Sequence, residues 1–413
     1  MKSKIILAAI IILSSSMAFT QWECRSKLGA HLKPFKKDFP LLWAIEQTSG
    51  HGYMNDRNIT NLMVFAGLDY SFKKNQFYIE GGSKGWHNSL GAPENYNHNG
   101  KNRKFIQQQR FGIREGFYKF KNDKIQLTAG FHSMGLGDLF LVNERGLGFS
   151  YRQEAGHITI SFTGASILKD FSRFGSFCSV HYLYNVLRDR EYAYLGDEIG
   201  ETNFAGMVIK WKPSHGNNDI ASGSEKKKSI IDHIGLILYS EFGTGIDTMK
   251  TDYGVMTGMK LPGKLKLGVE ALHQYHQDNQ ALLYFADLSR EFKFGSYGQT
   301  ILSAGYIGLQ ELDDNAMGYA SFSNLFIGEV MRLDLMDIPL YQFAARHRIP
   351  KWSSMIKIQT TQQFTDRHIS EYDIAVGKTF FKHAKLTLMF CRMDADDMPE
   401  VYYMGRGEIR ITF

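Results

Sequence analysis

The chain ends on the stretch Val-Tyr-Tyr-Met-Gly-Arg-Gly-Glu-Ile-Arg-Ile-Thr-Phe, which runs from Val401 to Phe413. Apolar and small residues alternate with mostly polar ones along it. One set comprises Val401, Tyr403, Gly405, Gly407, Ile409, Ile411 and Phe413, and the other comprises Tyr402, Met404, Arg406, Glu408, Arg410 and Thr412. Side chains two residues apart share a face of an extended chain. The stretch therefore predicts a β-strand with one apolar face and one polar face.

The position of this strand at the carboxy-terminus is informative as well. Terminal residues of soluble domains usually fray into water, whereas this chain ends on an aromatic residue. The segment resembles the closing strand of bacterial outer-membrane β-barrels, which ends on phenylalanine. The resemblance implies that the barrel-insertion machinery recognises Phe413. The last strand of a soluble sheet is the alternative that this stretch alone leaves open.

Composition favours one large β unit. The 413 residues are 14% aromatic and include 40 Gly but only 8 Pro, and proline removes a hydrogen bond from the ladder between strands. This length allows two or three domains, but no linker or change in composition divides the chain. The formal charge of +6 is too mild to indicate nucleic-acid binding.

The amino-terminus predicts a secretory signal peptide over residues 1–20. Lys2 and Lys4 precede the apolar run from Ile5 to Leu13, and small residues follow, so we expect cleavage after Ala18 or Thr20. The apolar run is shorter than the roughly 20 residues that a transmembrane helix needs. The expected mature protein, residues 21–413, is then either soluble and exported or crosses a membrane as strands.

Alternating segments of about ten residues, the length of a tilted transmembrane strand, recur through the mature chain. The predicted strands cover residues 59–70, 76–82, 105–114, 124–132, 147–152, 157–164, 177–186, 202–212, 230–242, 253–260, 264–274, 282–290, 297–309, 339–348, 355–364, 370–380, 385–393 and 401–413. Residues 39–45 are either a short first strand or a segment at the barrel mouth. Residues 310–337 are a strand pair, a loop folded into the lumen, or both. Because bacterial barrels prefer even strand numbers, the sequence predicts about 16–18 strands and favours eighteen.

The direction of the two faces decides the fold class. Ala205, Met207 and Ile209 oppose Gly206 and Lys210, and similar apolar sets oppose Gly, Gln and charged residues in other segments. Outward apolar residues around a mixed polar interior are typical of membrane barrels, whereas a soluble sandwich buries its apolar face. We therefore predict an all-β, transmembrane, antiparallel up-and-down barrel in the outer membrane of a Gram-negative bacterium, in contact with lipid and lipopolysaccharide.

Charged residues on the polar faces are the candidate functional residues. The predicted lumen-facing set is Arg110, Arg114, Arg152, Glu270, Glu371, Asp373, Arg406, Glu408 and Arg410. Such groups either steer ions by their sign or pair with one another and fill the interior. Since the mature chain is net positive, we expect a weak preference for anions if the arginines are unpaired.

No catalytic residue, cofactor site or metal site is predicted. His132 and Ser133 are adjacent, so regular strand geometry would point them to opposite faces. The three cysteines, Cys24, Cys178 and Cys391, have no spacing typical of a metal site. We therefore predict a protein that is not an enzyme.

A second resemblance bears on function. The stretch from Gly130 to Gly148 is similar to the strand-turn-strand pattern of porin-like barrels that export polysaccharides such as alginate. The resemblance implies a porin-like channel for passive passage or export of small polar solutes or oligosaccharides. The alternative is a non-conducting barrel that binds a partner protein or glycan as part of the cell surface or of a secretion or assembly machinery.

Overall fold

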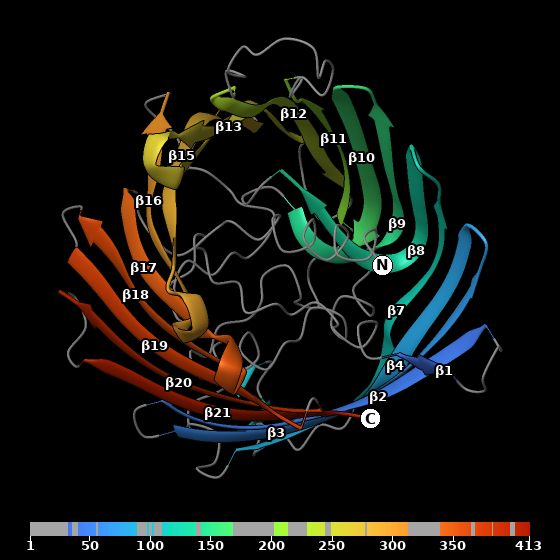
Figure 1. Cartoon of the computed structure of the whole chain (residues 1–413), viewed down its shortest axis with the longest axis vertical. Helices are drawn as coiled ribbons and strands as arrows, with labels where there is room; N and C mark the ends of the chain where they lie inside the picture. Colours follow the sequence, from blue (N-terminus) through green and yellow to red (C-terminus); the bar gives the residue numbers. More distant parts are fainter. Residues whose placement is uncertain are drawn as a thin grey trace.

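The computed structural model describes residues 32–34, 40–54, 57–88, 97–98, 101–102, 110–137, 142–167, 202–213, 229–243, 249–276, 279–312, 339–364, 368–381, 383–396 and 401–413. Eighteen long strands of these residues form one closed antiparallel ring (Figure 1). They are β2 (Leu41–Met54), β3 (Arg57–Phe72), β4 (Asn75–Asn88), β7 (Arg110–Lys121), β8 (Ile125–Leu136), β9 (Val142–Ala155), β10 (Ile158–Ile167), β11 (Thr202–Trp211), β12 (Ile231–Gly243), β13 (Lys250–Leu261), β14 (Leu265–His276), β15 (Asn279–Lys293), β16 (Gln299–Glu311), β17 (Leu340–Ile349), β18 (Ser354–Phe364), β19 (His368–Phe380), β20 (Ala384–Ala395) and β21 (Tyr402–Thr412).

The ring closes because the last strand pairs with the first long one. Each long strand pairs with its neighbours along the chain, and β21 pairs with β2, from Glu46 opposite Thr412 to Met54 opposite Met404. The two-residue strand β1 (Lys33–Pro34) pairs with β2 beyond the end of β21. A separate small ribbon consists of β5 (Asn97–His98) and β6 (Lys101–Asn102). Closure pairs the edges that an open sheet would leave exposed.

Short turns mark one rim of the barrel. Lys73, with a φ of 51°, helps to reverse the chain between β3 and β4, and Gly263, with a φ of 74°, does the same between β13 and β14. The carboxy-terminal residue Phe413 exchanges backbone hydrogen bonds with Ile45 at this rim. Short turns are typical of the periplasmic rim of outer-membrane barrels.

The polarity of the barrel is inverted relative to a soluble protein. Along β12, Leu236 is 55% exposed and Leu238 is 50% exposed, whereas Ile237 between them is 1% exposed. Glu371 and Asp373 on β19 are buried, while Tyr372 and Ile374 are exposed on the other face. Large apolar side chains therefore cover the outside and charged side chains line the inside. This arrangement suits a lipid environment and contradicts the soluble-sandwich alternative.

A β-bulge between β4 and β7 changes which residues face inward. Glu80 pairs with Glu115, but the next residue, Gly81, pairs with Ile113, so Arg114 is the extra residue. The shift reverses the alternation halfway along β7. The predicted strand at 105–114 overlaps only the first part of β7, which spans Arg110–Lys121.

The predicted fold class and the favoured strand number are confirmed. Of the segment expected to be a short first strand or to lie at the mouth, residues 41–45 begin the long strand β2, which is longer than predicted. The predicted strand at 177–186 and the expected signal peptide at 1–20 lie outside the described residues, as do residues 313–338. Within the described ranges, no helix has the length and hydropathy to cross a membrane.

Candidate functional site: the inner wall of the barrel

The inner wall carries more buried negative than positive charge among the described residues. Its buried carboxylates are Glu46, Asp69, Glu80, Glu241, Asp252, Glu270, Asp287, Glu371, Asp373 and Glu408. Its buried cationic side chains are Arg114, Lys250, Lys357 and Arg406. Charges on the wall, rather than the net charge of the whole chain, set the field that a solute inside the barrel meets.

Arg114 lies at the centre of a buried cluster next to the bulge. Its guanidinium pairs with Glu80 through Nε and with Glu46 through Nη1, the latter at 3.3 Å. It also lies over the ring of Phe65, 3.7 Å from the ring centroid. The second oxygen of Glu80 accepts a hydrogen bond of 2.5 Å from the hydroxyl of Tyr78. The cation is thus held by two carboxylates and an aromatic face.

Glu46 extends this cluster across the strand pair that closes the barrel. Its Oε2 lies 3.9 Å from Nε of Arg410 on β21, and Arg410 Nη2 lies 3.4 Å from Glu408 Oε1. We call Glu46, Glu80, Arg114, Glu408 and Arg410 the seam network. Arg114, Glu408 and Arg410 were among the sequence candidates. Glu46 and Glu80, which join them, were missed because neither lay in a segment whose polar face had been assigned.

The remaining sequence candidates lie elsewhere on the wall. Arg152 forms an exposed pair of 2.7 Å with Glu154, near the turn between β9 and β10. Arg406 and Glu270 are buried, at 6% and 2% exposure. Arg110 begins β7, but its side chain lies outside the described ones.

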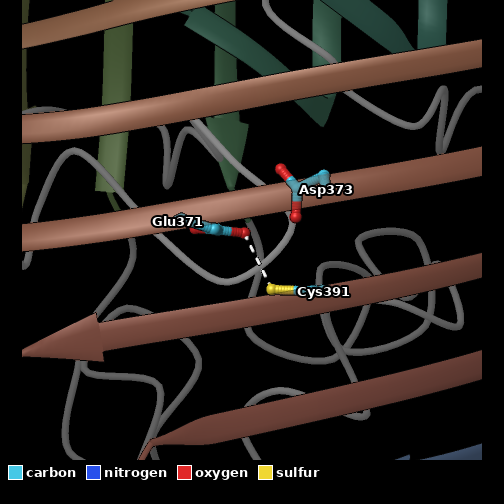
Figure 2. Close-up of side chains that lie close together, drawn as sticks. All are labelled: Glu371, Asp373 and Cys391. Atoms are coloured by element: carbon cyan, nitrogen blue, oxygen red, sulfur yellow. Dashed lines mark hydrogen bonds between the residues drawn. The ribbon is translucent and has the colours of Figure 1, made fainter.

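Glu371 and Asp373 meet a cysteine that the sequence had not linked to them. Figure 2 shows the three side chains converging between neighbouring strands, with Glu371 and Asp373 on β19 and Cys391 on β20. The Cys391 thiol donates a hydrogen bond of 3.3 Å to Glu371 Oε1. One ligand atom from each residue lies within 4.8 Å of the others. We call these residues the thiol cluster. The sequence carried no signal for it, since the contact depends on the register between strands.

Part of the inner wall is apolar. Buried residues pack there into one cluster, the apolar wall, which comprises Met134, Leu136, Phe204, Val208, Ile237, Tyr239, Met256, Leu272, Leu283, Phe285, Ile307 and Leu340. These positions alternate with exposed residues such as Leu236 and Leu238, so the strands concerned carry apolar side chains on both faces. The sequence predicted a mixture of Gly, Gln and charged residues on the inward faces, whereas this sector of the inner wall carries large apolar side chains.

Charged groups at the margin of the apolar wall differ in their pairing. Lys250 Nζ lies 2.5 Å from Glu241 Oε1, and Gln274 donates a hydrogen bond of 2.9 Å to Asp252. Asp287 is only 4% exposed, and no described residue donates a hydrogen bond to it or pairs with it. Its register partners on β14 and β16 are both glycines, Gly268 and Gly305, which offer it no side chain. A buried carboxylate without a described partner leaves an uncompensated negative charge at this point of the inner wall.

His132 contacts Ser150 on the neighbouring strand and not the adjacent Ser133. Its Nδ1 lies 3.0 Å from the carbonyl of Gly130 and its Nε2 lies 3.0 Å from Ser150 Oγ. The carbonyl can only accept, so Nδ1 carries the proton and Nε2 accepts from the Ser150 hydroxyl. Ser133 instead donates to Glu115 over 2.7 Å. At 5% exposure, His132 is out of reach of a substrate, so the geometry fits an interstrand contact better than a catalytic pair.

Comparison with known proteins finds similar folds but no similar sequences. No protein-family model matches the chain, and no curated protein matches it in sequence. Among solved structures, *Pseudomonas aeruginosa* OccD3 (OpdP) is similar with a TM-score of 0.55 and 9% identity, over 90% of this chain and 91% of that one. OpdK with vanillate gives a TM-score of 0.54 and 10% identity, over 92% of this chain and all (100%) of that one. OccK5 (OpdH) gives 0.53 and 8%, over 90% and 98%.

These likenesses and the inverted polarity define the class of protein. The chain is a porin-like outer-membrane β-barrel, and the predicted placement in the outer membrane is confirmed at this level. The expectation that the chain is not an enzyme stays a prediction. The similarity to polysaccharide-export barrels stays a prediction.

Proposed function

We propose that this barrel is a passive channel for small polar solutes, including short oligosaccharides. The observation that carries the proposal is the polar inner wall of a closed eighteen-stranded barrel. A barrel of this strand number encloses more space than its own inward side chains fill. One structural neighbour, OpdK, is described with the small aromatic acid vanillate, which supports small solutes as the class for this chain.

The wall charge supports a preference for cations over anions. Among the described residues, ten carboxylates are buried but only four cationic side chains are. The weak anion preference expected from net charge assumed unpaired arginines, whereas Arg114 is paired with two carboxylates. Unpaired negative groups such as Asp287 would instead favour cations near the wall.

Liposome swelling tests the channel function. The purified full chain is reconstituted into liposomes and exposed to sugars of increasing size. We expect rapid swelling with monosaccharides and a decline with chain length, because passage is limited by pore dimensions. Correctly folded barrels that cause no swelling would contradict the proposal and favour the alternative, a sealed barrel that binds a partner.

A further inference from the structure

We propose that the thiol cluster is a zinc-binding site on the inner wall, with Glu371, Asp373 and Cys391 as its ligands. The three residues offer one thiol and two carboxylates whose ligand atoms all lie within 4.8 Å of one another. All three are at least 98% buried, so the strands hold the donors in place. Metal binding here does not depend on whether the barrel conducts.

The donor set selects the ion. Thiolate, imidazole and carboxylate are the ligands that zinc uses in proteins. Magnesium and calcium prefer oxygen alone and gain little from a sulfur ligand, while copper(I) prefers sulfur and gains little from two carboxylates. A mixed set of one sulfur and two oxygens therefore fits zinc, with cadmium as a spectroscopic substitute.

The register of the sheet brings the donors together. Asp373 on β19 lies directly opposite Cys391 on β20, and Glu371 is two residues away on the same face. In a tetrahedral zinc site, a sulfur about 2.3 Å and an oxygen about 2.0 Å from the ion lie about 3.5 Å apart. The distance from Cys391 Sγ to Glu371 Oε1 is 3.3 Å, close to that edge. Little movement of these two atoms would be needed.

The surroundings of the cluster add a second argument. Met404 lies opposite Cys391 on β21, and Met393 lies opposite Glu371 on β20. Both methionines are buried, at 2% and 1% exposure. Their polarisable thioethers and methyl groups replace water around the ligands, which strengthens the attraction between a dication and two carboxylates.

The proton balance of binding is simple. Zinc binds the thiolate, so the Cys391 S–H bond breaks and its proton passes to solvent as the Zn–S bond forms. Both carboxylates bind in their ionised form. The ion then links β19 to β20 through ligands from both strands. No oxidant or reductant takes part.

The experiment uses the full chain, folded in detergent, with Cys24→Ser and Cys178→Ser so that Cys391 is the one remaining thiol. Cadmium is titrated and the cadmium–thiolate charge-transfer absorption is recorded, followed by displacement with zinc. We expect saturable absorption with one ion per chain. Glu371→Gln should weaken binding at least about 10-fold, because the loss of a ligand costs no less than the loss of an outer-shell partner.

Controls separate a built site from general attraction to carboxylates. Asp252→Asn removes another buried wall carboxylate and should leave cadmium binding unchanged, whereas adding Cys391→Ser should abolish the absorption. Only barrels that show the heat-dependent gel mobility of the folded form are compared. Absence of the absorption in the folded Cys391-only barrel would overturn the proposal. So would unchanged affinity in Glu371→Gln, or equal loss in Asp252→Asn.

Discussion

The seam network and the apolar wall are two sectors of one inner surface, and they differ in whether their buried charged groups are paired. In the seam network, Arg114 pairs with Glu46 and Glu80, and Glu46 continues to Arg410 on the closing strand. At the margin of the apolar wall, Asp287 lies between two glycines and has no partner among the described residues. Pairing cancels the field of a charge, whereas an isolated charge keeps it. The charges at the seam are thus paired across the strands that close the barrel, whereas Asp287 leaves an uncompensated negative charge on the inner wall.

The largest expected effect comes from breaking the seam network. Arg114→Met leaves Glu80 and Glu46, at 0% and 2% exposure, without their guanidinium. Removal of one partner from a buried pair costs about 3–5 kcal/mol. We expect the folded fraction in urea, followed by gel mobility, to fall accordingly.

Asp287→Asn is the matched control in the other sector. It removes a buried charge that pairs with no described residue, so stability should be unchanged or slightly higher. Equal destabilisation by both variants would contradict the claim that buried charge is paired in the seam network and unpaired at Asp287.

A somewhat smaller loss of stability is expected from a substitution on the outer, lipid-facing side of the closing strand. Ile409 is 48% exposed on β21, between the inward residues Glu408 and Arg410. A lysine there faces lipid and costs about 2–4 kcal/mol if it lies near the bilayer midplane. Arg410→Gln, one residue away, should cost much less, because Arg410 is partly exposed and its nearest carboxylates lie 3.4 and 3.9 Å away. Comparable stability of the two variants in lipid vesicles would mean that the faces are misassigned.

The smallest effect concerns ion selectivity. Asp287→Asn should shift the reversal potential in a salt gradient toward anions, since an unpaired negative group has been removed from the wall. Glu154→Gln removes the same charge at the exposed rim pair with Arg152 and should shift it less, because solvent and salt screen that pair. A larger shift from Glu154→Gln would place the selective region at the rim instead of at the apolar wall.

The sequence predicted the fold well because each strand carries its own signal. The alternation from Val401 to Phe413 is a local property, and it recurs in every strand whose outward face is apolar. It failed where a register shift changed the phase, at the bulge beside Arg114, and where both faces are apolar, as around Ile237. A simple two-residue period in the sequence reveals neither the register shift nor which apolar face points inward.

The candidate site was harder to predict because its contacts join distant residues. Glu46 and Arg114 are 68 residues apart in the chain, and Glu371 and Cys391 are 20 apart. Which of them meet depends on strand pairing and register. The sequence therefore identified Arg114, Glu371 and Asp373 as inward candidates but gave no information about their partners.

Single-channel conductance of the purified full chain in a planar bilayer tests the central claim most directly. We expect steady, ohmic current steps that appear with insertion of folded barrels, with a reversal potential on the cation side. Urea-unfolded protein serves as a check that current requires the closed barrel, because it should give no steps. Folded wild-type barrels that insert and never conduct would contradict the claim that this protein is a channel.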